Sequence, residues 1–173
     1  LAAGDLEKNL KARSVEILLG KEADEAFITE TQPDALVVAT GATPMIPSIP
    51  GIHLSKVVLA WDVLAGKATV GKKVIIVGGN AVGLETALYL ASQGTLSPEV
   101  LHFLTVNKAE SPETLEQLLN HGNKEVCVVE MTKKVGQDIG NSTRWTIMAE
   151  LKRLGVKTVT GARAIEVAED GLR

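Results

Sequence analysis

The stretch VIIVGGNAVGLETALYL, residues 74–90, constrains the fold more than any other part of the sequence. Residues 73–77 are an apolar run that fits a buried parallel strand, and a glycine-rich turn follows at 78–83. Residues 81–92 are then predicted to form a helix, which Gly94 closes. A strand that passes through such a turn into a helix is typical of α/β folds. We therefore predict a central parallel sheet with helices on its faces, in which Val74–Val77 and Val126–Val129 are neighbouring strands.

The turn itself predicts a site for the pyrophosphate of a dinucleotide. Free N–H groups and the positive end of the helix dipole attract anions where a helix begins. Gly78 permits the tight turn, Gly83 lets helix and strand pack together, and Asn80 stands where a second glycine usually lets the pyrophosphate approach. Asparagine tolerates left-handed backbone angles, and its amide could donate to a phosphate oxygen; Gly79 adds local freedom. A strand, turn and helix without any ligand is the competing interpretation.

An acidic residue is expected at the end of the next strand, where it can accept hydrogen bonds from a ribose diol. Glu130, which ends VCVVE, suits this role. It lies further from the turn than the roughly 20 residues of the usual unit. Two Ser-Pro pairs, at 97–98 and 111–112, predict two inserted helices that account for the excess, because serine caps helices and proline favours their first turn.

The remaining elements follow from shorter patterns. Pro44–Gly51 contains three prolines and is expected to be a linker. In the helix of residues 141–154, capped by Asn141 or Ser142, an apolar face is predicted from Ile147, Met148, Leu151 and Leu154. Further helices are expected at 4–14 and 60–64, and strands at 15–20, 23–31 (weak), 35–39, 156–161 and 164–170.

Composition excludes several classes of function. The net charge of −3 gives no electrostatic reason to expect nucleic acid or an anionic membrane as a partner, and no apolar run is long enough to span a bilayer. The single cysteine, Cys127, forms no internal disulfide or cysteine-ligated metal cluster, and we expect it to be buried and inert in a cytoplasmic protein. Trp61 and Trp145 are expected to be packing residues. The three histidines show no metal spacing.

Three segments resemble a known family: PDALVVATGATPMIPSIPGI, VVLAWDVLAGKATVGKKVIIVGGNAVGLETA and VVEMTKKVGQDIG. They look like the C-terminal half of the NADH:flavin oxidoreductases related to 2,4-dienoyl-CoA reductase, trimethylamine dehydrogenase and 2-enoate reductase. The insert looks most like the enoate-reductase branch. The chain does not begin with methionine and stops within a strand–turn–strand pattern, so we expect a fragment of a longer protein.

The resemblance implies an arrangement of domains and cofactors. Residues 1–56 would be the tail of an FAD-type domain and a linker. Residues 57–173 would be a Rossmann-like NAD(H)-binding domain with a helical insert at 95–125. FAD, FMN and a 4Fe-4S cluster are implied only for the longer parent, whose remaining domains would be this chain's partners. The oligomeric state is left open.

The resemblance also implies roles for particular residues. The turn would bind the cofactor through Gly78, Gly79, Asn80, Ala81, Val82 and Gly83. Glu85 would face its nicotinamide half, although a solvated glutamate is an equal alternative. Glu130 would favour NADH over NADPH. Lys133 and Lys134 could hold the 2′-phosphate of NADPH, but a solvated pair is the preferred interpretation. Thr40, Gly41 and Ala42 would lie at the crossover between the two dinucleotide domains. No residue of this chain is expected to be catalytic.

The parent is therefore expected to be an enzyme that passes electrons from NADH through FAD and an iron–sulfur cluster to FMN. An unsaturated acid or an enoyl or dienoyl thioester would be reduced, and the isolated fragment would be inactive. The alternative function is a non-catalytic dinucleotide-binding module used for assembly or sensing.

Overall fold

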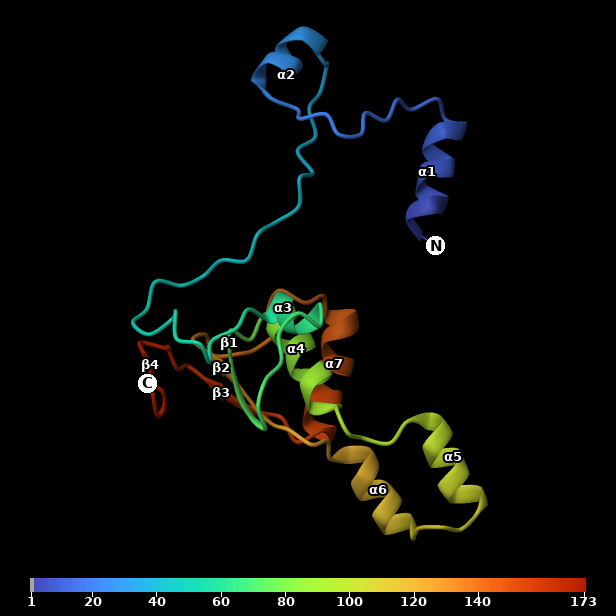
Figure 1. Ribbon diagram of the computed structural model, residues 1–173, viewed down its shortest axis with the longest axis vertical. Helices are drawn as coiled ribbons and strands as arrows, with labels where there is room; N and C mark the ends of the chain where they lie inside the picture. Colours follow the sequence, from blue (N-terminus) through green and yellow to red (C-terminus); the bar gives the residue numbers. More distant parts are fainter. Residues whose placement is uncertain (1) are drawn as a thin grey trace. The chain divides into compact units, whose positions relative to one another are not determined.

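The computed structural model describes residues 2–173, and side chains from residue 3 onward. The chain is divided into two compact units, which are Leu1–Ala42 and Thr43–Arg173 (Figure 1). Each is considered by itself. The assignment of residues 1–56 to an FAD-type domain stays a prediction.

The first unit is helical in its regular parts. It contains α1 (Ala2–Ala12) and α2 (Glu25–Thr31), and the side chain of Asp24 caps α2 by accepting a hydrogen bond from the N–H of Phe27 at 2.8 Å. The predicted helix at 4–14 is thus largely confirmed, whereas the weak strand at 23–31 was wrong, because this cap makes the segment helical.

The strands predicted at 15–20 and 35–39 are also absent from the described residues of this unit. Val37 is 85% exposed and Leu19 is 87% exposed, so neither segment lies in an apolar interior. A parallel strand requires a neighbouring strand for its backbone hydrogen bonds, and the described part of this unit contains none. The apolar pattern alone cannot supply that partner.

The second unit contains a parallel sheet in the order β1-β2-β3, formed by Lys73–Val77, Glu125–Glu130 and Lys157–Thr160. Val74 pairs with Val126, and Val77 pairs with Val129. The predicted adjacency and parallel direction of these two strands are therefore confirmed, and with them the α/β class. The carboxyl ends of all three strands meet at one edge of the sheet, where the site described below lies.

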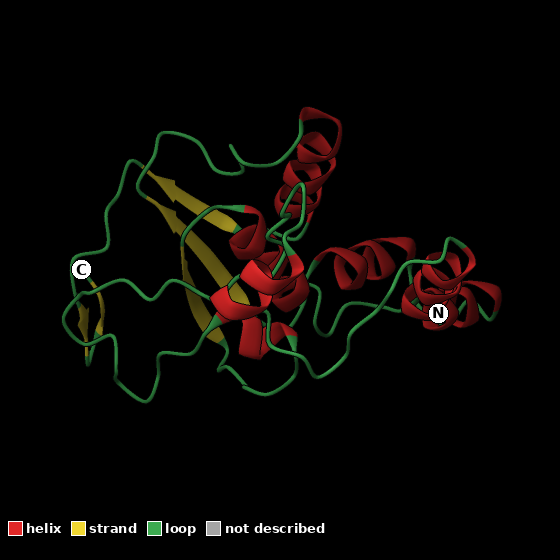
Figure 2. Ribbon diagram, turned by 90° about the horizontal axis from the view of Figure 1, so that it is seen from above, coloured by secondary structure: helices red, strands yellow, loops and turns green. Residues whose placement is uncertain are grey.

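Helices cover one face of this sheet (Figure 2). They are α3 (Ala60–Leu64), α4 (Ala81–Ala91) and α7 (Asn141–Arg153), and α4 contacts β1, β2, α3 and α7. The core between them and the sheet includes fully buried Leu84, Leu90, Val128 and Leu151. The apolar face predicted for α7 is confirmed, because Ile147 and Met148 pack against this core together with Leu151 and Leu154.

The opposite face of the sheet is largely exposed among the described residues, so the predicted helices are found on one of its two faces. Ile75 and Val77 on β1 are each 51% exposed, and Val159 on β3 is 45% exposed. Cys127 on β2 is only half-buried, so the prediction of a buried thiol was wrong in degree. Parallel sheets are ordinarily covered on both faces, so this exposed apolar face is unusual for its class.

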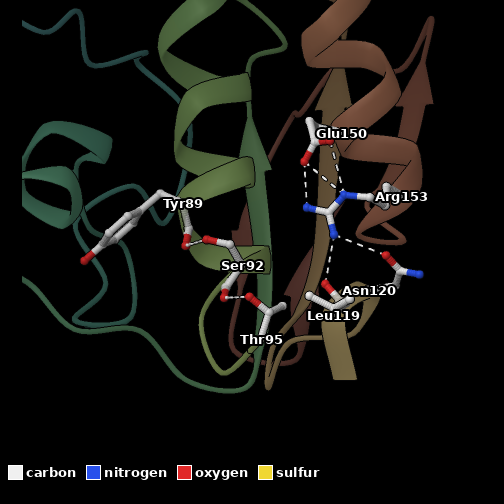
Figure 3. A network of polar contacts seen from close by, with 7 residues as sticks. All are labelled: Tyr89, Ser92, Thr95, Leu119, Asn120, Glu150 and Arg153. Atoms are coloured by element: carbon white, nitrogen blue, oxygen red, sulfur yellow. Dashed lines mark hydrogen bonds and ion pairs between the residues drawn. The ribbon is translucent and has the colours of Figure 1, made fainter. Parts of the chain in front are cut away.

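The insert forms α5 (Pro98–Val106) and α6 (Pro112–Asn120), as the two Ser-Pro pairs predict. Ser97 and Ser111 cap these helices by accepting from the N–H groups of Val100 and Thr114. Arg153 of α7 connects the insert to the core: it donates to the backbone oxygen of Leu119 at 2.8 Å and to Asn120 Oδ1 at 3.2 Å (Figure 3). The same guanidinium is held by Glu150, because Arg153 Nη2 donates to Glu150 Oε2 at 2.6 Å.

Three smaller expectations need correction. The N-cap of α7 is Gly140 rather than Asn141 or Ser142. The strand predicted at 164–170 shortens to β4 (Val167–Ala168), which pairs antiparallel with β5 (Gly171–Leu172). Trp61 and Trp145 are 44% and 67% exposed, so neither is a core residue. Aromatic identity alone does not reveal which side of a helix faces the core.

Candidate functional site

The glycine turn joins β1 to α4 through two positions that have steric reasons to be glycine. Gly78 has a φ of 107°, which side chains disfavour, and its N–H donates to the Val129 oxygen at 2.9 Å. A Cβ at Gly83 would lie 2.0 Å from the Gly78 oxygen. These are the roles predicted for the first and third glycines: a tight turn and close packing of helix on strand.

Gly79 is more constrained than the sequence indicated. A Cβ on it would lie 2.6 Å from Val135 Cγ1 and 3.1 Å from the Cβ of Glu130. Its oxygen accepts a hydrogen bond from the N–H of Gly136 at 2.6 Å. Gly79 therefore joins the turn to the loop that follows β2, rather than only adding local freedom.

Asn80 is the N-cap of α4 and does not adopt the left-handed conformation considered from the sequence. Its φ and ψ are −81° and −178°, which is extended backbone. Its Oδ1 accepts from the Gly83 N–H at 3.0 Å. Asparagine is a favourable N-cap residue, and its side-chain oxygen faces the helix here. Donation by its amide nitrogen to a phosphate stays a hypothesis.

Glu130 lies beside the turn, at the end of β2. Its Oε2 accepts from the Gly79 N–H at 2.7 Å, and its Oε1 accepts from the Thr132 N–H at 2.7 Å. These two backbone hydrogen bonds, that from Gly79 first, lower the pKa of Glu130 below its ordinary value. The side chain is therefore held as a carboxylate in a fixed orientation. Each oxygen of a carboxylate has a second lone pair, so further hydroxyl groups can still donate to it.

Asp138 is the residue that sequence reasoning missed. Its Oδ2 accepts from the N–H of Ala81, the first residue of α4, at 3.0 Å, although 57 positions separate the two residues. Among the described residues, the N–H groups of Asn80 and Val82 have no protein acceptor. The only available signal was a carboxylate in the segment GQDIG after β2, which is weak because exposed loop aspartates are common.

The other predicted residues are exposed. Glu85 lies on the solvent side of α4, and Lys133 and Lys134 lie in the loop after β2. Residues Thr40, Gly41 and Ala42 belong to the first unit, where they lie in an exposed segment without regular structure. Their roles stay predictions.

The described part of the chain contains neither a metal-binding cluster nor a membrane-spanning helix. Residues 2–173 contain no cluster of three or more His, Cys, Asp or Glu side chains placed to hold a metal ion. No helix within those residues has the length and apolar character needed to cross a bilayer.

A parallel sheet with a tight glycine turn, a capped helix and a carboxylate at the end of the second strand defines a dinucleotide-binding α/β domain. The pyridine nucleotide-disulphide oxidoreductase family model matches residues 4–172, and the chain belongs to this family. That fold implies binding of FAD and a pyridine nucleotide.

Similar proteins carry the names of redox enzymes. The chain is 46% identical over 145 residues to a metal reductase of Desulforamulus reducens and 31% identical over 171 residues to an NADH oxidase of Thermoanaerobacter brockii. These alignments cover 84% and 96% of this chain. A structure of 2-naphthoyl-CoA reductase matches with a TM-score of 0.62 and 26% identity over 96% of this chain.

The chain spans only 22% of the length of both curated relatives and 21% of the 2-naphthoyl-CoA reductase chain. The family match establishes that the chain belongs to an oxidoreductase family, and its relatives include reductases of several kinds. The finer relation to 2,4-dienoyl-CoA reductase that the sequence suggested stays a hypothesis.

Proposed function

We propose that this chain binds NADH and orients it for flavin reduction within a larger NADH-dependent flavin oxidoreductase. The observation that carries the proposal is the Glu130 carboxylate, fixed at 2.7 Å from the N–H of Gly79 at the edge of the glycine turn. A ribose diol that reaches this edge would meet an acceptor that is already ionised and oriented.

The turn fits the pyrophosphate of such a cofactor. Gly78 has no side chain to cover the turn, and the N–H groups of Asn80 and Val82 are without protein acceptors among the described residues. Helix α4 directs its positive end to the same place. When bound, the nicotinamide supplies the hydride chemistry. The residues of this chain supply binding, orientation and the choice between NADH and NADPH.

The terminal acceptor is proposed from the relatives. We infer that electrons pass through FAD and an iron–sulfur cluster to FMN and then to an unsaturated acid or thioester. A cinnamate reductase of Clostridium sporogenes that is 46% identical over 85 residues supports this class of substrate. Relatives named for metal and bilirubin reduction align with 84% and 96% of this chain, and the cinnamate reductase aligns with 49%. Similarity among proteins named for such different acceptors suits a domain that binds their common electron donor.

The test of Glu130 compares cofactors in the intact protein. Flavin reduction by NADH should be faster than by NADPH at equal subsaturating concentrations, because a 2′-phosphate would place like charges together. Glu130→Ala should largely erase this preference. Glu125→Ala, at the exposed beginning of the same strand, is the matched control and should keep it. Equal rates with both cofactors in the unmodified protein would remove Glu130 from this role.

The alternative is a non-catalytic dinucleotide-binding module for assembly or sensing. It predicts that NADH binds but reduces no flavin in the intact protein. Anaerobic mixing with NADH, followed by the absorbance of the flavin, distinguishes the two functions.

A further inference from the structure

We propose that Asp138 occupies the pyrophosphate position of the glycine turn in the free protein, so that a dinucleotide must displace this carboxylate in order to bind. The inference rests on the proposed function of the turn. It adds a residue that sets the affinity of the site by competing with the cofactor.

The first step concerns the N–H group that Asp138 accepts. Ala81 is the first residue of α4, and its N–H lies at the positive end of the helix, where a phosphate oxygen would bind. Asp138 Oδ2 lies 3.0 Å from this nitrogen. While the carboxylate holds this donor, a phosphate can use only the neighbouring N–H groups of Asn80 and Val82. Two anions would then share one helix terminus, which electrostatic repulsion disfavours.

The second step concerns what else Asp138 does. Helix α4 already has a cap, because Asn80 accepts from the Gly83 N–H at 3.0 Å and Leu84 donates to the Asn80 oxygen at 2.9 Å. Asp138 is therefore a second acceptor, supplied from a distant loop. Within the described residues, its carboxylate forms no ion pair with Lys, Arg or His.

The third step concerns how the loop is held. Gly136 donates to the Gly79 oxygen at 2.6 Å, and Arg144 Nη2 donates to the Val135 oxygen at 3.0 Å. These contacts keep the beginning of the loop against the turn. Asp138 itself is exposed, so its side chain can rotate into water without displacing core residues. Glu130, with both oxygens bonded to backbone, is the fixed carboxylate, and Asp138 is the displaceable one.

Calorimetric titration of the intact protein with NADH and with ADP-ribose tests the proposal. Asp138→Asn keeps an acceptor for the Ala81 N–H but removes the charge, whereas Asp138→Ala removes both. Both variants should bind either ligand about three- to tenfold more tightly than the unmodified protein, the size expected for one solvent-exposed hydrogen bond. Part of this gain should shrink as salt rises, since salt screens the repulsion. Asp170→Asn, which makes the same charge change in the β4–β5 hairpin, should leave affinity unchanged.

The outcomes separate the two levels of inference. If the unmodified protein binds NADH and both Asp138 variants bind it equally or more weakly, Asp138 does not compete and the inference is overturned while the proposed function stands. A gain with NADH that is absent with ADP-ribose also overturns it, because ADP-ribose retains the pyrophosphate. If no form of the protein binds NADH, both the inference and the proposed function fail.

Discussion

At the scale of single residues, the turn depends on the close approach of backbone atoms at Gly83. A Cβ there would lie 2.0 Å from the Gly78 oxygen, so the strand or the helix would have to move. We expect Gly83→Ala to lower the free energy of unfolding by about 1–3 kcal/mol, as overpacking typically does. Urea denaturation measures this effect. Gly71→Ala, where an added Cβ has no atom within 4 Å, is the control and should be nearly neutral.

Asn80 combines two effects that a substitution can separate. Asn80→Gly removes the Oδ1 cap on the Gly83 N–H, which should cost only a few tenths of a kcal/mol because glycine is a tolerated cap. The same change frees that N–H and removes a side chain beside the pyrophosphate position. We therefore expect stronger NADH binding by calorimetry. A clear loss of affinity would show instead that the asparagine amide binds the phosphate.

Glu130 predicts a dependence of stability on pH. Its pKa is lowered in the folded state by the N–H groups of Gly79 and Thr132. It therefore stabilises the fold above the unfolded pKa of a glutamate, about 4.3, and this contribution is lost as pH falls through the lower folded value. Free energies of unfolding measured from pH 6 downward should fall more steeply for the unmodified protein than for Glu130→Gln. Parallel curves would contradict the assignment.

At the scale of elements, sequence reasoning succeeded where local chemistry decides the structure. The Ser-Pro pairs gave the starts of α5 and α6, and the glycine turn gave the boundary between β1 and α4. It failed for the strands at 15–20 and 35–39, which depend on partners outside the segment. Asp138 was missed for the same reason, since its contact with Ala81 spans 57 positions.

The insert offers an element that can be loosened without altering the turn. Arg153→Ala removes the donors to Leu119 and Asn120 (Figure 3). We expect a loss of about 0.5–1 kcal/mol, because the contacts are partly solvated. Hydrogen exchange should quicken in α6 and remain unchanged in β1 and β2. Lys152→Ala is the control on the same turn of α7. Uniform acceleration throughout the sheet would contradict a local role for Arg153.

At the scale of the whole molecule, the stable core lies within one unit. Every buried apolar residue described, from Val63 to Leu154, belongs to Thr43–Arg173. The described residues of the first unit include none that is buried, and its two helices have 11 and 7 residues. Short helices without a packed face are marginal in water. Unfolding of the chain should therefore be governed by the second unit.

This reasoning predicts the result of a truncation. A chain that begins at Thr43 should unfold cooperatively, with a Tm within about 2 °C of that of residues 1–173, since 1 kcal/mol shifts Tm by about 2–4 °C at this size. Circular dichroism during heating measures both transitions. The matched comparison is Leu84→Ala in each chain, which should cost about 2–5 kcal/mol in both because that side chain is fully buried. A fall of more than about 5 °C on truncation would mean that residues 1–42 stabilise the sheet domain, contrary to the exposure of their apolar side chains.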